Sequence, residues 1–400
     1  MKYIVVLGDG MADEPVSELG GMTPLEYSHT PVMDQLAMES EIGLAATIPA
    51  GMKPGSDTAN LAVLGYDPEI YYTGRSPLEA LSIGVKMEDT DIALRCNIVT
   101  VSDDDRPFAE KTIIDHSSGE VTTEEAAELI EAVKAKFQDE TYQFYVGTSY
   151  RHLTIWKEGE VCELTPPHDI LGKVIGEYLP EDEKLRYFME QSYEILNNHP
   201  VNKARAERGL NKANSLWFWG AGKKPALDSF AGKYNKKGAL ISAVDLLKGI
   251  AVGTGMTNII VKGADGTLET NYEGKADAAV KAVLEDGFDF AYIHVEAPDE
   301  MGHQGNLNNK IKAIEYLDSR VIRRILDKMR ASGEDFKLLI MPDHPTPLSV
   351  RTHTSDPVPY MIYDSTKELA EPFFYCEKCA AKTGRMFEKG YELMKYFLTT

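Results

Sequence analysis

Short apolar runs that end in polar residues recur along the chain and are its clearest pattern. The first is Tyr3-Ile-Val-Val-Leu-Gly, which stops at Asp9. Runs of this kind are typical of parallel strands that are buried on both faces. The pattern predicts strands at Tyr3–Asp9, Ser215–Trp219, Gly238–Ser242, Phe288–Val295, Phe336–Met341 and Val358–Tyr363.

Segments with apolar residues at helical spacing lie between these runs. The longest is Asn308–Arg330, where Ile311, Ile314 and Leu317 begin a repeat that suits one buried helix face. The same spacing predicts helices at Lys184–Asn198 and Ala276–Glu285. Strands that alternate with helices predict an α/β fold, with a parallel sheet sandwiched by helices.

Residues 86–178 have a different pattern, in which strands and one helix form a small α+β unit. The predicted elements of this segment are Asp91–Val101, Thr123–Phe137, Tyr142–Gly147 and His152–Trp156. We therefore expect an inserted smaller α+β cap domain at residues 86–178. The core domain is expected to combine residues 1–85 with residues 179–400.

The charge and composition of the chain exclude some classes of protein. A formal net charge of -21 argues against a nucleic-acid partner, because phosphate backbones attract basic surfaces. No apolar run approaches the roughly 18 residues of a membrane span, and the N-terminus does not read as a signal peptide. Four cysteines are few for 400 residues. The lone Cys376-x-x-Cys379 pair favours two ordinary thiols, with a redox or labile metal role as the alternative. These features predict a cytoplasmic enzyme without a membrane partner.

Acidic residues stand at the ends of three predicted strands. Asp9 closes the first strand, Asp299 follows the strand at Phe288–Val295, and Asp343 follows the strand at Phe336–Met341. Ligands of open parallel sheets gather at the carboxyl ends of the strands. A single aspartate there often only caps the next helix, but three of them favour a shared site.

Histidines accompany these acids at spacings that suit metal binding. Asp299 and His303 are four residues apart, so both point to the same side of a helical turn. Asp343 and His344 are adjacent, and His353 follows on a loop. Taken alone, each histidine fits a structural role better than a ligand role. Together the oxygen and nitrogen donors suit two borderline divalent ions, such as manganese or zinc.

A candidate nucleophile lies at the start of another predicted helix. Ser56 stands in Pro54-Gly-Ser-Asp-Thr-Ala-Asn60, which leads into an apolar segment. A helix N-terminus beside a cation stabilises an ionised hydroxyl and favours an incoming phosphate. The alternative is that Ser56 or Asp57 serves only as an N-cap.

In this chain order, these residues resemble the motif set of the alkaline phosphatase superfamily, and most closely that of the archaeal-type cofactor-independent phosphoglycerate mutases. The shared set comprises Asp9, Ser56, Asp299, His303, Asp343, His344 and His353. Further resembling segments are Leu7–Asp13, Pro54–Leu61, Tyr72–Ala80, Leu94–Asn97 and His294–His303. They span most of the chain.

The resemblance implies an intramolecular phosphotransferase that interconverts 2-phosphoglycerate and 3-phosphoglycerate, a step of glycolysis and gluconeogenesis. It implies a phosphoserine on Ser56, an inserted domain that closes over the substrate, and no 2,3-bisphosphoglycerate. It also implies two divalent ions, manganese first, with magnesium, zinc or cobalt as alternatives. One ion is expected on Asp9, Ser56, Asp343 and His344, and the other on Asp299, His303 and His353.

A small phosphorylated carboxylate needs cations to bind it, and the candidates are Arg75, Arg95, Arg151 and His152, although each arginine fits a surface ion pair equally well. One segment departs from the family. Where archaeal-type relatives tend to carry several arginines, this chain has Asp115-His-Ser-Ser-Gly-Glu120. A related homoserine kinase or a metal-dependent phosphatase therefore remains an alternative. Gly220-Ala-Gly-Lys-Lys224 lacks the spacing and the hydroxyl of a nucleotide-binding P-loop.

Overall fold

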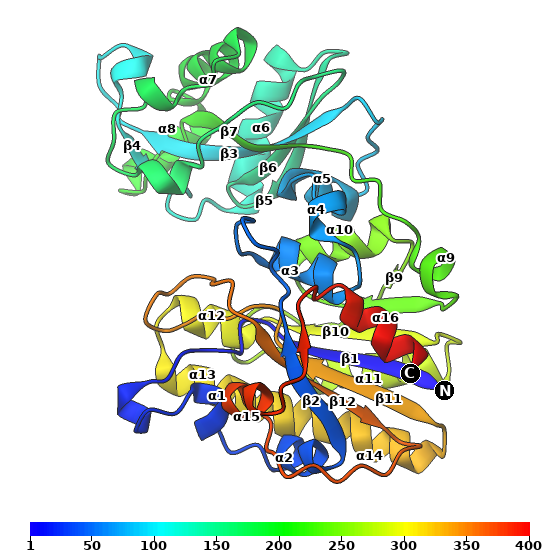
Figure 1. Cartoon of the computed structure of the whole chain (residues 1–400). Helices are drawn as coiled ribbons and strands as arrows, with labels where there is room; N and C mark the ends of the chain where they lie inside the picture. The colour runs from blue at the N-terminus through cyan, green and yellow to red at the C-terminus, as the bar shows by residue number, and fades with distance from the viewer. The chain divides into compact units, whose positions relative to one another are not determined.

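A computed structural model describes residues 1–400 and divides them into two compact units. The first unit combines Met1–Tyr72 with Ala226–Thr400, and the second is Thr73–Pro225. In Figure 1 the residues of the second unit run from light blue through cyan to green, in the order of the colour bar. The expected α/β fold with an inserted smaller α+β unit is confirmed.

The first unit is built on an eight-stranded sheet with the order β13-β2-β12-β11-β1-β10-β8-β9. Its strands are β1 (Lys2–Gly8), β2 (Ser40–Ala45), β8 (Gly238–Ile241), β9 (Thr257–Asn258), β10 (Phe290–Val295), β11 (Phe336–Met341), β12 (Val358–Asp364) and β13 (Met386–Phe387). The strand β1 lies between β10 and β11 and is parallel to both. The carboxyl ends of these three strands therefore meet at one edge of the sheet.

One predicted strand of this sheet runs in the opposite direction. The strand β12 is antiparallel to both β11 and β2. Parallel neighbours need a crossover connection, which is usually a helix. The segment between β11 and β12, residues 342–357, contains no helix, so the chain turns back beside β11.

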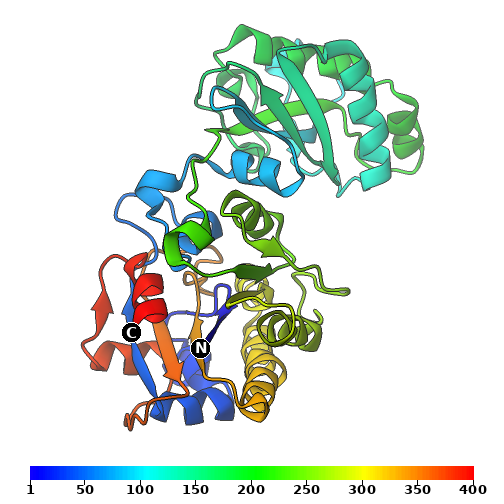
Figure 2. The same cartoon turned by 90° about the vertical axis from the view of Figure 1, so that its right-hand side faces the viewer.

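Helices cover both faces of this sheet, as Figure 2 shows. The helices of the first unit are α1 (Pro24–Tyr27), α2 (Pro31–Met38), α3 (Ser56–Val63), α4 (Pro68–Tyr71), α9 (Phe230–Tyr234), α10 (Asp245–Gly253), α11 (Tyr272–Leu284), α12 (Ala297–His303), α13 (Leu307–Tyr316), α14 (Arg323–Ser332), α15 (Glu377–Lys382) and α16 (Glu392–Thr399). A π-helical turn, Leu317–Ile322, joins α13 to α14, so the long helix predicted at Asn308–Arg330 is confirmed as one run. A 3-10 turn lies at Ser17–Leu19. No helix of the molecule is long and apolar enough to span a membrane.

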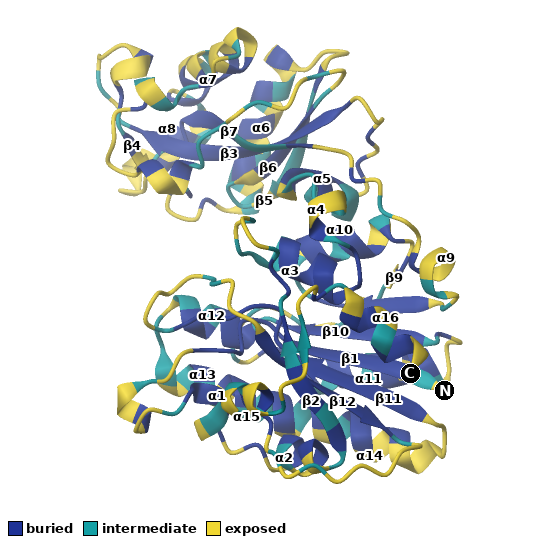
Figure 3. Ribbon diagram, viewed as in Figure 1, coloured by how far each residue is buried: buried dark blue, intermediate teal, exposed yellow.

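The burial of β1 explains its uninterrupted apolar sequence. Ile4 and Val6 are fully buried in the core cluster that also contains residues of α11 and α14. Tyr3 points to the opposite face, where its ring meets Phe397 of α16 edge to face at 5.7 Å. Figure 3 shows the central strands as the buried layer of the unit. Because both faces are covered, neither tolerates the polar alternation of a half-exposed strand.

The second unit has a five-stranded sheet, formed by β3 (Ile92–Val101), β4 (Ile113–Asp115), β5 (Tyr142–Thr148), β6 (Arg151–Trp156) and β7 (Ser215–Lys223). The strand β3 is buried along its whole length and pairs antiparallel with both β6 and β7. The helices are α5 (Arg75–Ser82), α6 (Thr123–Phe137), α7 (Glu183–Leu196) and α8 (Pro200–Glu207). Short 3-10 turns lie at Phe108–Glu110, Pro167–Ile170 and Gly176–Tyr178.

This unit extends beyond the expected segment 86–178 on both sides. The sequence places the helix at Lys184–Asn198 and the strand at Ser215–Trp219 in the core domain, but both belong to the inserted unit. The reason is packing: Leu185 and Trp217 are buried in the same core cluster as β3. The long apolar β7 therefore completes the sheet of the second unit.

Candidate metal centre and nucleophile

Three buried aspartates gather at the carboxyl ends of the central strands of the first unit. Asp9 directly follows β1, Asp299 lies in the first turn of α12 after β10, and Asp343 lies two residues beyond β11. Their exposed fractions are 2%, 7% and 0%. Since β1 lies between β10 and β11, the fold brings these carboxyls together in the way that the strand-end pattern predicts.

The first set of donors surrounds His344. Its Nε2 atom lies 3.0 Å from the Oγ of Ser56, 3.5 Å from Asp9 Oδ1 and 3.4 Å from Asp343 Oδ2. Ser56 is the first residue of α3, and its preceding residue Gly55 has extended backbone. The hydroxyl thus stands at a helix N-terminus beside two carboxylates and one imidazole.

The second set is formed by Asp299, His303 and His353. The two oxygens of Asp299 lie 3.3 Å from His303 Nε2 and 3.4 Å from His353 Nε2. The two imidazole Nε2 atoms face each other at 2.9 Å. Asp299 and His303 share one face of α12, because they are four residues apart.

The two sets are neighbours. The rings of His344 and His353 lie 4.0 Å apart between centroids. One donor atom each of Asp299, His344 and His353 lies within 4.8 Å of the others, and the same holds for Asp9, His294 and Asp343. We call the six predicted side chains the Asp/His cluster: Asp9, Asp299, His303, Asp343, His344 and His353.

Hydrogen bonds hold Asp343 in place, and sequence reasoning missed the residues that supply them. The amide of Gly10 donates to Asp343 Oδ1, and Asn60 Nδ2 donates to Oδ2. The hydroxyl of Tyr292 donates in turn to Asn60 Oδ1 at 2.6 Å. Asn60 is four residues after Ser56 and therefore lies on the same face of the helix. This spacing is the sequence signal that indicates Asn60.

Close packing around Asp299 explains a glycine of the Leu7–Asp13 motif. Gly10 has a φ of 60°, and a Cβ atom there would lie 2.6 Å from Asp299 Oδ1 and 2.5 Å from Thr346 Oγ1. Thr346 also donates a hydrogen bond to Asp299. Only glycine fits this approach of backbone to carboxylate.

The electrostatics of the Asp/His cluster favour a bound cation. Burial, followed by the charges of Asp343 and Asp299, raises the pKa of Asp9 well above its usual value. The basic groups within ion-pair distance of the three carboxyls are imidazoles. Asp9 Oδ1 is buried and has no hydrogen-bond partner. An unpaired buried carboxylate oxygen beside nitrogen donors fits a divalent cation.

The imidazoles respond differently to this environment. A hydrogen bond to Asp299 raises the pKa of His303 to about 9, whereas burial lowers the pKa of His344. Burial raises the pKa of Asp299, but the hydrogen bonds from His303 and His353 outweigh it and hold that pKa well below its usual value. The second set is therefore a charge-balanced group as long as His303 keeps its proton.

In the second unit, the structure brings together the three predicted arginines, which we call the arginine group: Arg75, Arg95 and Arg151. Arg75 and Arg95 both pair with Glu79, at 3.0 Å and 3.1 Å. The guanidinium of Arg95 also lies 4.4 Å from the ring centre of Trp219. Arg95 and Arg151 lie on the paired strands β3 and β6. Burial, followed by the charges of Arg75 and Arg151, lowers the pKa of Arg95 to about 10.

His152 does not join the arginine group. It pairs with Cys96 across β3 and β6, whereas Arg151 pairs with Asn97, so the two side chains point to opposite faces of the sheet. His152 is 4% exposed, and burial lowers its pKa to about 3.

The arginine-poor segment 115–120 forms a tight turn that is closed by its own polar groups. Asp115 accepts hydrogen bonds from the amides of Ser117 and Gly119, and Ser118 and Glu120 have φ values of 53°. The buried Arg205 reaches this turn, but it donates to the carbonyl of Ser118. The segment therefore adds no free guanidinium to the arginine group.

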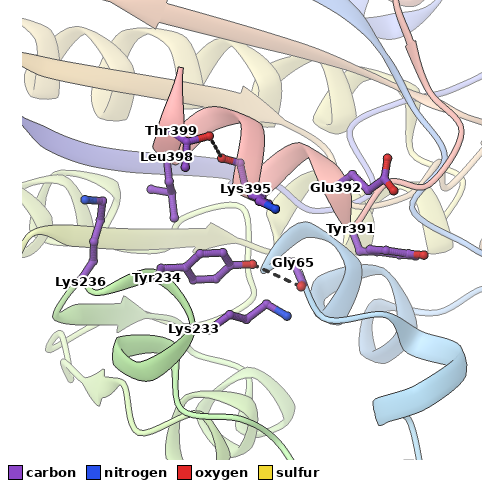
Figure 4. A pocket seen from close by; sticks show the side chains of 9 residues that line it. All are labelled: Gly65, Lys233, Tyr234, Lys236, Tyr391, Glu392, Lys395, Leu398 and Thr399. Atoms are coloured by element: carbon purple, nitrogen blue, oxygen red, sulfur yellow. Dashed lines mark hydrogen bonds between the residues drawn. The ribbon is translucent and has the colours of Figure 1, made fainter.

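A separate cavity of about 520 Å³ lies elsewhere in the first unit. It is lined by α9, α16 and Gly65, as Figure 4 shows. Three lysines contribute to its wall: Lys233, Lys236 and Lys395. No residue of the Asp/His cluster lines it, so this cavity and the candidate site are distinct.

Comparison with known proteins adds the family. Residues 37–202 match the family model described as 2,3-bisphosphoglycerate-independent phosphoglycerate mutase. A protein of that name from Methanosarcina barkeri is 48% identical over 391 residues, which are 96% of each chain. A Geobacter sulfurreducens protein named as a probable mutase of this type is also 48% identical, over the whole length of both chains.

Solved structures agree with this result. A protein of Pyrococcus horikoshii has a TM-score of 0.81 at 29% identity and covers 99% of this chain, matching 97% of its own. The cofactor-independent phosphoglycerate mutase of Thermoplasma acidophilum has a TM-score of 0.64 at 25% identity. The match covers 100% of this chain and 99% of that protein. With relatives this similar along its whole length, the chain belongs to the family of 2,3-bisphosphoglycerate-independent phosphoglycerate mutases.

Proposed function

We propose that the chain interconverts 2-phosphoglycerate and 3-phosphoglycerate by passing the phosphoryl group through Ser56. The observation that carries this proposal is the position of Ser56 Oγ, which lies 3.0 Å from His344 Nε2 at the Asp/His cluster. Support for the substrate comes from relatives of 48% identity that are named as phosphoglycerate mutases. The reaction is an isomerisation that consumes no 2,3-bisphosphoglycerate.

The family and the donors of the cluster indicate bound divalent metal ions. We infer one ion on Asp9, Ser56, Asp343 and His344, and a second on Asp299, His303 and His353. Mixed oxygen and nitrogen donors favour manganese, with magnesium, zinc or cobalt as alternatives. When bound, such ions supply positive charge that stabilises an ionised hydroxyl and the oxygens of a transferring phosphoryl group.

The serine performs two successive displacements. In the first, Ser56 Oγ bonds to phosphorus, the bond from phosphorus to the substrate oxygen breaks, and that oxygen receives the serine proton. In the second, the other hydroxyl of the glycerate attacks the phosphoserine, and Ser56 recovers a proton as its bond to phosphorus breaks. Ser56 begins the eight-residue helix α3, so its first amides favour the phosphate in both steps.

The arginine group supplies the cations that bind the substrate anion. A guanidinium binds carboxylate or phosphate through two parallel hydrogen bonds and stays charged at any working pH. Arg95 Nε is a buried donor without a hydrogen-bond partner, although it lies within ion-pair distance of Glu79. That unused donor favours Arg95 as the principal contact to the substrate.

We also propose that the enzyme works in the cytoplasm. All four cysteines are free thiols, and two of them, Cys96 and Cys376, are buried. A reducing compartment maintains this state.

The reaction can be tested with purified enzyme, 3-phosphoglycerate and Mn²⁺, without bisphosphoglycerate or ATP. The expected product is 2-phosphoglycerate, measured by coupling to enolase. Release of inorganic phosphate instead of 2-phosphoglycerate identifies a phosphatase. Turnover that requires ATP and homoserine identifies a kinase, and either result refutes the proposal.

A further inference from the structure

A fully buried histidine outside the predicted set lies beside the first group of donors. His294 belongs to β10 and is 0% exposed. Its Nε2 atom lies 2.9 Å from Asp9 Oδ2, and its Nδ1 atom lies 3.2 Å from the Oγ of Ser242. Both ring nitrogens are therefore engaged, one toward the cluster and one away from it.

An ionised carboxylate only accepts hydrogen bonds, so the Nε2 atom of His294 donates to Asp9 Oδ2 and carries the ring proton, and the bonds of Ser242 agree with this. The amide of Val244 donates to Ser242 Oγ at 3.0 Å, so that oxygen already serves as an acceptor. Its own proton is then available for Nδ1 of His294, which accepts it. The ring proton accordingly resides on Nε2 and is donated to Asp9 Oδ2.

The backbone of His294 is fixed as well. Its carbonyl accepts a hydrogen bond of 3.1 Å from the ammonium of Lys275, a fully buried side chain of α11. The ring thus stands on a central strand whose end is held by a buried cation. Hydrogen bonds to both the ring and the backbone therefore fix the orientation of the Nε2–H group.

The hydrogen bond from His294 leaves the second carboxylate oxygen of Asp9 without a partner. His294 occupies Oδ2, whereas Oδ1 faces His344 Nε2 at 3.5 Å and has no hydrogen-bond partner. We propose that His294 is a positioning residue that reserves Oδ1 of Asp9 for a divalent cation, and that His294 itself is not a ligand. This inference rests on the metal-dependent function proposed above.

The competing role is that of a metal ligand, since the donors of His294, Asp9 and Asp343 lie within 4.8 Å of one another. A ligand nitrogen must offer its lone pair to the ion. At Nε2 a proton takes that place and points to Asp9 Oδ2. The two roles therefore predict different behaviour when the ring is replaced by another donor.

The test compares His294→Gln, which keeps an N–H near the position of Nε2, with His294→Leu, which removes it. Metal-free protein is titrated with Mn²⁺ by calorimetry, and Co²⁺-loaded protein is examined by X-ray absorption for its number of nitrogen ligands. We expect the leucine variant to bind one ion about 10- to 100-fold more weakly. The glutamine variant stays within about threefold of the parent, and its count of nitrogen ligands is unchanged.

Ser242→Ala provides a second test that leaves the ring in place. Because it frees Nδ1 from its donor, we expect weaker binding of one ion, by less than the leucine variant shows. His29→Leu, at an exposed histidine, is the control and should not change the affinity. Thermal unfolding of the metal-free variants confirms that each one folds.

Parent-like affinity in His294→Leu overturns the inference, and so does equal weakening in the glutamine and leucine variants with one nitrogen ligand lost. If His294→Leu does not fold, His294→Gln and Ser242→Ala still decide: a lost nitrogen ligand in the first, or unchanged affinity in the second, contradicts the positioning role. Failure of the proposed function is a separate result, because it appears in the parent enzyme as the absence of phosphoglycerate interconversion.

Discussion

The Asp/His cluster of the first unit and the arginine group of the second unit differ in how far neighbouring groups compensate their charges. In the cluster, three buried carboxyls have only imidazoles as basic neighbours, and Asp9 Oδ1 has no partner. In the arginine group, Arg75 and Arg95 share Glu79, and Arg95 also lies over Trp219. The cluster is short of positive charge, whereas two of the arginines lie within ion-pair distance of one carboxylate, that of Glu79.

This difference suits the cluster to phosphoryl transfer and the arginine group to substrate binding. A buried excess of carboxylates is costly without a cation, so the cluster depends on what it binds. In the proposed mechanism, Arg75 and Arg95 exchange their contact with Glu79 for contacts with the substrate. Changes in the cluster should therefore abolish turnover, whereas changes in the arginine group should mainly weaken substrate binding.

The largest effect is expected from Ser56→Ala, because no other hydroxyl lies at that position. Turnover should fall roughly 10⁴-fold or more. Binding of Mn²⁺ should persist in part, because the other donors remain. The measurement is the enolase-coupled rate beside a metal titration, with Ser17→Ala at an exposed serine as the control. Parent-like turnover in this variant would contradict the role of Ser56 as the nucleophile.

Loss of one donor from the second set should remove one ion selectively. Asp299→Asn and His353→Gln should each weaken one of the two ions by more than about 100-fold and leave the other bound. Metal content after dialysis measures this, with Asp286→Asn, at a carboxylate paired with Lys281, as the control. Two ions retained in both variants would refute the division into two sets.

A smaller effect is expected in the arginine group. Arg95→Gln removes charge-assisted hydrogen bonds worth about 1.5–3 kcal/mol, which corresponds to a rise in KM of roughly 10- to 150-fold. Metal binding should not change. Arg106→Gln, at an exposed arginine paired with Asp104, is the matched control. A loss of metal from Arg95→Gln contradicts the separation of the two groups.

The pH dependence of the metal-free protein tests the second set more finely. The pKa of His303 is raised to about 9 by Asp299, so its stabilising contribution is complete below the ordinary histidine pKa near 6.5. It is lost as the pH rises through 9. The melting temperature should therefore fall over this interval, and less steeply in His303→Gln. Equal slopes in both proteins contradict the assignment.

The smallest effect concerns a helix of the second unit that contains none of the proposed site residues. Thr122 caps α6 by accepting a hydrogen bond from the amide of Glu125. Thr122→Ala should cost about 1 kcal/mol of stability, and Thr122→Ser should restore most of it. Denaturant unfolding measures the change, which should leave metal binding untouched.

Sequence patterns predicted the cluster well because strand ends define it. Asp9, Asp299 and Asp343 follow strands that are apolar throughout, and parallel pairing alone brings such positions together. The spacing between Asp299 and His303 likewise required only a helical turn. The supporting donors were missed because Tyr292 and Thr346 act through long-range contacts that no local spacing reveals.

The limits of the inserted unit and the partners of the arginines were harder to predict. The strand β7 has the apolar pattern of a core strand, and only its pairing with β3 places it in the second unit. His152 stands beside Arg151 in the sequence, but strand alternation separates their side chains. The pairing of Arg95 with Glu79 joins residues of α5 and β3, which no local spacing indicates.

The central claim is that the phosphoryl group passes through Ser56, and peptide mapping tests it most directly. The Mn²⁺-loaded enzyme is mixed with 3-phosphoglycerate, quenched in acid within the first turnovers and digested. We predict a phosphopeptide that contains Ser56, formed while 2-phosphoglycerate appears and absent when substrate is omitted. Conversion to 2-phosphoglycerate at an undiminished rate in Ser56→Ala, or phosphate found on a different residue, would contradict it.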